Sequence, residues 1–107
     1  MVRMPRSVRV GHRIFDVVLW DTKAADRCGA RGHCQQEPPV IRIARYLKSF
    51  DKAEVMIHEL FHTEWTLPTE GVSEEEAVSL LAASFAQIWS DNPKLVEWIT
   101  DSLERKE

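Results

Sequence analysis

The chain has 107 residues, of which 44% are hydrophobic and 29% charged, and its formal net charge is −3. This length predicts one domain over residues 1–107, and this composition excludes collagen-like, disordered and low-complexity proteins. No apolar run approaches the roughly 20 residues that cross a bilayer, and no secretory signal follows the basic first residues, so we expect no membrane partner and a cytoplasmic location.

The first half of the chain has the patterns of β-strands. Residues 7–20 alternate apolar with polar side chains on either side of Gly11, which predicts a pair of short strands around a turn or bulge. Residues 21–37 are mostly polar and predict a loop with part of a hairpin. Residues 40–44 are rich in β-branched side chains and predict a further strand.

A helical period begins near residue 51. Asp51 and Glu54 have the three-residue spacing of a capping box, which marks the start of a helix. Apolar residues then recur on one helical face, and the two signals together predict a helix over residues 52–65.

Two more helices are predicted after this one. Ser73 and Glu76 form a second capping box, which opens a helix that runs through Trp89. The Asp-Asn-Pro sequence at residues 91–93 ends it, and residues 94–105 form a short third helix. Because strands come first and helices last, the predicted fold class is α+β, with a small antiparallel or mixed sheet followed by three helices.

The first predicted helix carries the motif His58-Glu59-Leu60-Phe61-His62, which has the form HExxH. Residues four apart on a helix project side by side, so His58 and His62 can share one metal ion. Glu59 points beside this pair, where it can accept a proton from water at the metal instead of acting as a ligand. Imidazole donors favour Zn²⁺. The alternative is a pair of helix histidines that only cap or hydrogen-bond, with Glu59 on a solvated face.

A catalytic zinc site takes a third protein ligand. No histidine follows His62, so the remaining donors are acidic: Glu64, Glu70, Glu74, Glu75, Glu76 and Asp91. Glu75 is favoured because it continues a stripe of small residues along which the second helix could approach the first: Ser79, Ala82 and Ala86. Glu76 is the second choice. The alternative for these glutamates is a simple electrostatic match to a helix N-terminus.

Other side chains are candidates for supporting roles. The donor that stabilises an oxyanion would be one of four residues: Tyr46, His33, His12 or Arg42. Trp20 and Trp65 would line a groove or belong to the core. Cys28 and Cys34 are interpreted as thiols of the β-region, because a structural zinc site uses a tighter cysteine pair and four donors; a second metal site with His33 is the less favoured alternative.

The order of these features resembles small phage-encoded zincin-like proteins and is similar to minimal metallopeptidases of the ImmA/IrrE and SprT-like kind. The features are a β-rich start, the HExxH helix, and a helix that opens with Ser73-Glu74-Glu75-Glu76 and ends at Asp91-Asn92-Pro93. The resemblance covers about residues 8–98, and HExxH is its specific motif. It implies a minimal gluzincin with His58 and His62 as zinc ligands, Glu59 as general base and a glutamate of the following helix as third ligand.

The sequence therefore predicts a zinc-dependent metallopeptidase that acts on a peptide or protein substrate. Zinc held by His58, His62 and Glu75 would polarise a water molecule, and Glu59 would remove its proton and pass it to the leaving amine. We expect an extended substrate to lie along a sheet edge near residues 40–44 and to add to the sheet as a strand.

The alternative function is a catalytically inactive zincin-fold protein that acts as a metal-stabilised module and binds a protein or a nucleic acid. The uneven distribution of charge favours this alternative, since residues 1–50 hold 10 Lys/Arg against 4 Asp/Glu, whereas residues 51–107 hold 4 against 13. However, the basic residues are not interleaved with aromatic side chains and match no nucleic-acid-binding motif. A solvated basic face is therefore favoured, and nucleic acid is the less favoured partner.

Overall fold

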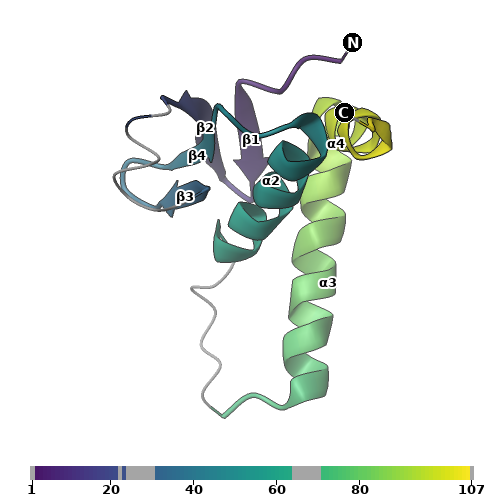
Figure 1. Cartoon of the computed structure of the whole chain (residues 1–107). Helices are drawn as coiled ribbons and strands as arrows, with labels where there is room; N and C mark the ends of the chain where they lie inside the picture. The colour runs from purple at the N-terminus through teal and green to yellow at the C-terminus, as the bar shows by residue number, and fades with distance from the viewer. Residues whose placement is uncertain (1, 22, 24–30, 64–70, 107) are drawn as a thin grey trace.

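The computed structural model describes residues 2–21, 23, 31–63 and 71–106. In this part of the chain, a four-stranded mixed sheet is followed by three helices, which confirms the predicted α+β class (Figure 1). The strands are β1 (Ser7–Val10), β2 (Arg13–Trp20), β3 (Gly32–Gln35) and β4 (Val40–Ala44). The helices are α2 (Ser49–Thr63), α3 (Glu74–Asp91) and α4 (Pro93–Glu104).

The described strands lie in the order β1-β2-β4-β3. β1 and β2 form an antiparallel hairpin, and Gly11 in its turn has a φ of 64°, a conformation that favours glycine. β2 runs parallel to β4, and β3 runs antiparallel to β4. β4 therefore has a partner on both sides, and the expectation that residues 40–44 form an exposed sheet edge is wrong. β3 is the edge strand instead.

One face of the sheet is apolar because side chains of a strand alternate between its two faces. The side chains that point to this face are buried in β1, β2 and β4, and they include Val8, Val10, Phe15, Val17, Ile41 and Ile43. The intervening residues Arg9 and Asp16 are exposed. The hydrophobic core therefore lies on one side of the sheet, where the helices pack.

Helix α2 covers this apolar face with the side chains of Ala53, Met56 and Leu60, which are fully buried. Helix α4 adds a second set of buried side chains to the same core: Leu95, Trp98 and Ile99.

Helix α2 begins at Ser49, three residues before the predicted start. Asp51 consequently lies in the first turn of the helix instead of capping it, and its carboxylate forms an ion pair of 3.5 Å with Arg31. Arg31 also contacts Glu54 at 3.5 Å. The two acidic residues that suggested a capping box therefore contact the residue that precedes β3.

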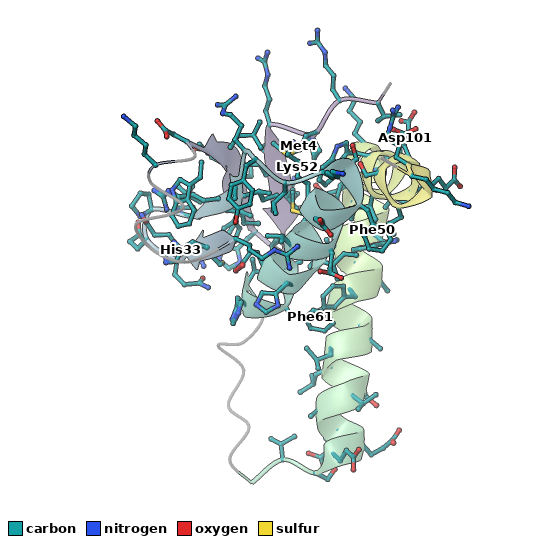
Figure 2. The ribbon with its side chains drawn as sticks, viewed as in Figure 1. Met4, His33, Phe50, Lys52, Phe61 and Asp101 are labelled. Atoms are coloured by element: carbon teal, nitrogen blue, oxygen red, sulfur yellow. The ribbon has the colours of Figure 1, made fainter. Side chains whose placement is uncertain are left out.

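Helix α3 extends away from the rest of the molecule (Figure 1). Its predicted cap is confirmed, since the Ser73 hydroxyl accepts a hydrogen bond of 3.2 Å from the backbone N–H of Glu76. Ile88 is its one buried residue, and Phe85 packs on Phe61 of α2 with ring centroids 4.5 Å apart. Phe61 lies between α2 and α3 (Figure 2). Only the second half of α3 therefore contributes to the core. None of the described helices is both long and apolar enough to span a membrane.

Candidate metal centre

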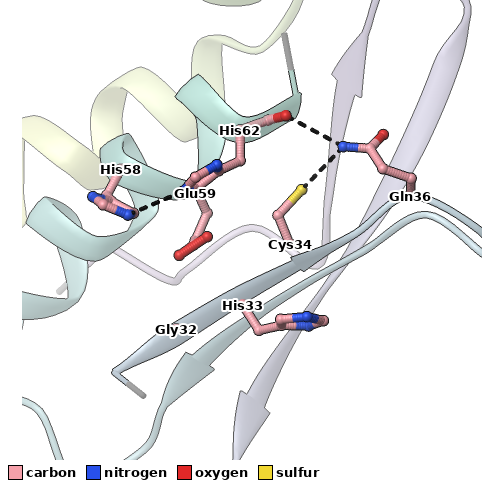
Figure 3. A pocket seen from close by; sticks show the side chains of 7 residues that line it. All are labelled: Gly32, His33, Cys34, Gln36, His58, Glu59 and His62. Carbon is pink, nitrogen blue, oxygen red and sulfur yellow. Dashed lines mark hydrogen bonds between the residues drawn. The ribbon is translucent and has the colours of Figure 1, made fainter. Parts of the chain in front are cut away.

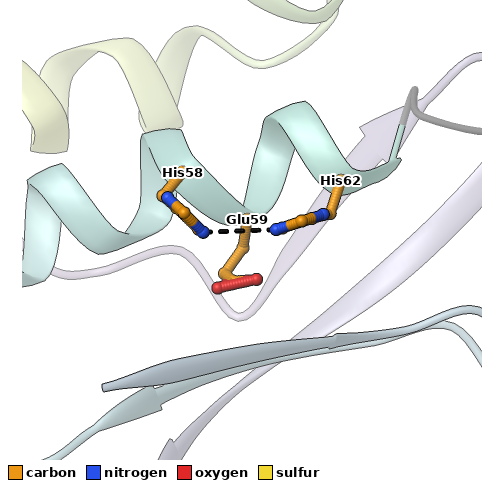
Figure 4. Close-up of side chains that lie close together, drawn as sticks. All are labelled: His58, Glu59 and His62. Atoms are coloured by element: carbon orange, nitrogen blue, oxygen red, sulfur yellow. Dashed lines mark hydrogen bonds between the residues drawn. The ribbon is translucent and has the colours of Figure 1, made fainter. Parts of the chain in front are cut away.

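The HExxH motif lies on α2, as predicted, and its two histidines and its glutamate lie together. The Nε2 atoms of His58 and His62 are 3.2 Å apart, and the two rings meet edge to face with centroids 4.9 Å apart (Figure 4). Both histidine side chains are exposed, whereas Glu59 is 4% exposed. The helix therefore presents two accessible nitrogens beside one buried carboxylate.

The separation of the two nitrogens fits a shared metal ion. Two imidazoles that bind one tetrahedral zinc ion at about 2.0–2.1 Å have their ligating nitrogens about 3.3 Å apart. The observed distance between the two Nε2 atoms is 3.2 Å. A carboxylate oxygen of Glu59 lies within 4.8 Å of the ligand atoms of both histidines. The donor set and its spacing therefore fit one shared metal ion.

Glu59 owes its burial to the close approach of the edge strand. It points from α2 toward β3 (Figure 3), and Gly32 lies directly opposite. A Cβ atom at Gly32 would overlap the Val55 side chain and would lie 3.1 Å from a carboxylate oxygen of Glu59. Burial raises the pKa of the Glu59 carboxyl, and the positive charge of nearby imidazoles opposes this: those of His58, His62 and His33.

A groove of about 430 Å³ lies along the contact between α2 and β3 and reaches the turn after β3 (Figure 3). It is lined by the motif residues on one side and by residues 32–36 on the other: His58, Glu59, His62, Gly32, His33, Cys34 and Gln36. The two imidazoles and the carboxylate therefore border an open space that a ligand can enter.

The described structure does not bring Glu75 to the histidine pair. The prediction required the small residues Ser79, Ala82 and Ala86 to pack on α2, but all three are exposed. Glu75 lies in the first turn of α3, at the end far from α2 (Figure 1), and is exposed. Glu75 is consequently outside the only group of potential metal ligands found among the described residues.

The other described acidic candidates also lie outside the group formed by His58, Glu59 and His62. Glu74 and Glu76 are exposed in the same distant turn as Glu75. Asp91, at the opposite end of α3, accepts a hydrogen bond of 3.0 Å from Gln87. Glu64 and Glu70 lie outside the described residues. None of the described acidic candidates from α3 thus joins the group of potential ligands formed by His58, Glu59 and His62.

Of the four predicted oxyanion donors, His33 is the one that lines the groove. Its ring stacks on that of Trp20, with centroids 5.8 Å apart and an angle of 14° between the planes. Arg42 donates a hydrogen bond of 3.0 Å to Gln35. Tyr46 follows β4 and His12 lies in the turn after β1; both are exposed and away from the groove lining.

Of the two cysteines and Trp65, which were candidates for supporting roles, only Cys34 lies among the described residues. Cys34 is a free, half-buried thiol that lines the groove, and burial raises its pKa to about 11. It belongs to no group of potential metal ligands among the described residues. Cys28 and Trp65 lie outside the described residues.

Sequence reasoning missed Gly32 and Gln36. A glycine inside a strand often marks the close approach of another segment, so Gly32 carried a usable signal. Gln36 carried none, because its role depends on contacts with residues 26 positions away. No protein-family model, curated protein or solved structure matches the chain. The site is therefore interpreted from its own geometry.

Proposed function

We propose that this chain is a zinc-dependent metallopeptidase with a minimal zincin-like fold. The proposal is carried by the 3.2 Å separation of the His58 and His62 Nε2 atoms beside the buried carboxylate of Glu59. His58 and His62 would hold the ion, because neutral imidazole nitrogens are common zinc ligands. The groove next to them supplies the access that a substrate needs.

Glu59 has the position of a general base. When bound, Zn²⁺ supplies a Lewis acid that makes water acidic near neutral pH and stabilises negative charge on a carbonyl oxygen. The Glu59 carboxylate accepts a proton from the attacking water and delivers it to the leaving amine. Because Glu59 is held between α2 and Gly32, its carboxylate stays oriented toward the groove through both transfers.

An extended peptide fits the groove along β3. Among the described residues β3 pairs only with β4, so its other edge offers backbone N–H and C=O groups to an added strand. The same strand lines the groove through Gly32, His33 and Cys34. A peptide added at this edge would pass the histidine pair and Glu59. This placement replaces the expected edge at residues 40–44.

The test combines metal analysis with peptide cleavage. Protein purified without chelator is analysed by inductively coupled plasma mass spectrometry, and a peptide library derived from a cell proteome is incubated with it and read by mass spectrometry. We expect about one zinc per chain and defined cleavage sites. Glu59→Gln should keep the metal and lose at least about 100-fold in cleavage rate, the usual contribution of a general base. His58→Ala should lose both metal and cleavage.

The matched control is Glu54→Gln, the same substitution on the same helix at an exposed residue that contacts Arg31 and does not line the groove. It should cleave like the unmodified protein. The proposal fails if the unmodified protein holds no zinc or if Glu59→Gln cleaves normally. A protein that holds zinc but cleaves no peptide is the alternative, a metal-stabilised binding module.

A further inference from the structure

Gln36 connects the last described turn of α2, the helix of the histidine pair, to two strands of the sheet. Its side-chain amide nitrogen donates to the backbone carbonyl oxygen of His62 at 3.2 Å and contacts the Sγ atom of Cys34 at 3.7 Å (Figure 3). Its side-chain oxygen accepts a hydrogen bond of 2.7 Å from Arg13 on β2. Arg13 also donates to the Gln36 backbone carbonyl. The Gln36 side chain thus bonds to α2 through its amide nitrogen and to β2 through its amide oxygen.

Arg13 determines which way the Gln36 amide faces. A guanidinium group only donates hydrogen bonds, so the amide oxygen must face Arg13 and the amide nitrogen must face the helix. Arg13 is itself held over the Phe15 ring, with its guanidinium carbon 4.8 Å from the ring centroid. The donor that reaches His62 is therefore oriented from β2, on the far side of β4 from β3.

The partner of this donor is a carbonyl in the last described turn of α2, which reaches Thr63. The Gln36 amide bonds to the His62 carbonyl from outside the helix and so ties this turn to the segment after β3. His62 lies in this turn, and its Nε2 atom must stay close to that of His58 for the two to share an ion.

We propose that Gln36 is a positioning residue for the metal centre, which holds the last described turn of α2 so that the imidazoles of His58 and His62 stay together, with Arg13 orienting its amide. This inference rests on the proposed function, because it assumes that the histidine pair binds a metal. Removing partners that orient metal ligands commonly weakens metal affinity 10–100-fold. We expect a loss of about tenfold here, because Gln36 contacts the backbone of His62 and not its ring.

The main variant is Gln36→Met, which removes the donor and the acceptor without adding charge and keeps the side chain about as long. The matched control is Gln35→Met, one residue earlier. The Gln35 side chain bonds to Pro38 and Arg42 and does not line the groove. Arg13→Met is a second variant, which leaves Gln36 in place but removes the group that orients it.

Co²⁺ is the probe, because its visible absorption reports both affinity and ligand geometry. Titration well below the unfolding temperature, with folding checked by circular dichroism, should show about tenfold weaker binding and an altered spectrum for Gln36→Met. Arg13→Met should change in the same direction by less, and Gln35→Met should match the unmodified protein. The inference is overturned if Gln36→Met binds Co²⁺ with unchanged affinity and spectrum, or if Gln35→Met is affected equally.

A measurement on the metal-free protein separates this inference from the proposed function. Long-range ¹H–¹⁵N NMR spectra report the tautomers and contacts of histidine rings. Gln36→Met should change the signals of His58 and His62, whereas Gln35→Met should not. If the unmodified protein binds no Co²⁺, the proposed function fails, and unchanged ring signals would then overturn the positioning role as well.

Discussion

Gly32 of the edge strand packs against α2, the helix that carries the HExxH motif, and replacing it with alanine tests how tightly the two are packed. The new Cβ would overlap the Val55 side chain and lie 3.1 Å from both the Arg42 carbonyl oxygen and a Glu59 carboxylate oxygen. Val55 is buried, and a β-branched side chain on a helix has one strongly preferred rotamer, so it cannot turn aside. The strand must therefore shift.

Overpacking of this kind costs about 1–3 kcal/mol of unfolding free energy. For a domain of this size each kcal/mol lowers the unfolding temperature by about 4 °C, so we expect Gly32→Ala to unfold about 4–12 °C lower in a thermal scan followed by circular dichroism. Urea denaturation gives the free energy directly.

A double-mutant cycle identifies the cause. Val55→Ala removes the atoms that the new Cβ would overlap, so the double variant should be more stable than the sum of the single effects by at least about 0.5 kcal/mol. Val55→Ala should relieve only part of the strain that Gly32→Ala introduces, because the close contact of the new Cβ with the Arg42 carbonyl oxygen remains. A Gly32→Ala protein as stable as the unmodified one, or a cycle without coupling, would show that helix and strand are not in close contact here.

Two more predictions follow from single side chains. Because burial raises the pKa of Cys34 to about 11, iodoacetamide at pH 8 should label this thiol in metal-free protein about 100-fold more slowly than an ordinary thiol, and the labelling rate should rise until the pH passes 11. Peptide mapping by mass spectrometry distinguishes the label on Cys34 from that on Cys28. Fast labelling of Cys34 at pH 8 would contradict its burial. Asn92→Ala should lower the unfolding free energy measured in urea by about 1–3 kcal/mol, because the Asn92 side chain forms hydrogen bonds with the backbone N–H and carbonyl of Arg9 and with the carbonyl of Ile88. An unchanged midpoint of urea unfolding would count against these hydrogen bonds.

Features that depend on neighbouring residues were predictable from the sequence. The alternation in residues 7–20 predicted β1 and β2, and the β-branched run predicted β4 over the observed bounds. The cap at Ser73 and the Asp-Asn-Pro sequence that separates α3 from α4 also act locally. The histidine pair belongs to this class, because its spacing depends only on the geometry of one helix.

Features that depend on distant pairing were not predictable. The sequence of β4 does not reveal that β3 covers its second edge, so the edge strand was assigned to the wrong residues. The start of α2 was placed too late, because Asp51 contacts Arg31 across the chain instead of capping the helix. Glu75 was chosen from a stripe that is suitable for packing but is exposed. The role of Gln36 depends on pairing of the same kind.

The two parts of the site therefore differ in contact order. His58 and His62 are four positions apart and meet as soon as one helical segment forms, a process of about a microsecond or less. The enclosure of Glu59 requires Gly32, 27 positions earlier, and hence the slower docking of a strand. If the histidine pair binds a divalent ion as proposed, an ion present during refolding would meet the two nitrogens before the carboxylate is enclosed, so capture of the ion alone is no proof that the polypeptide has reached its native state.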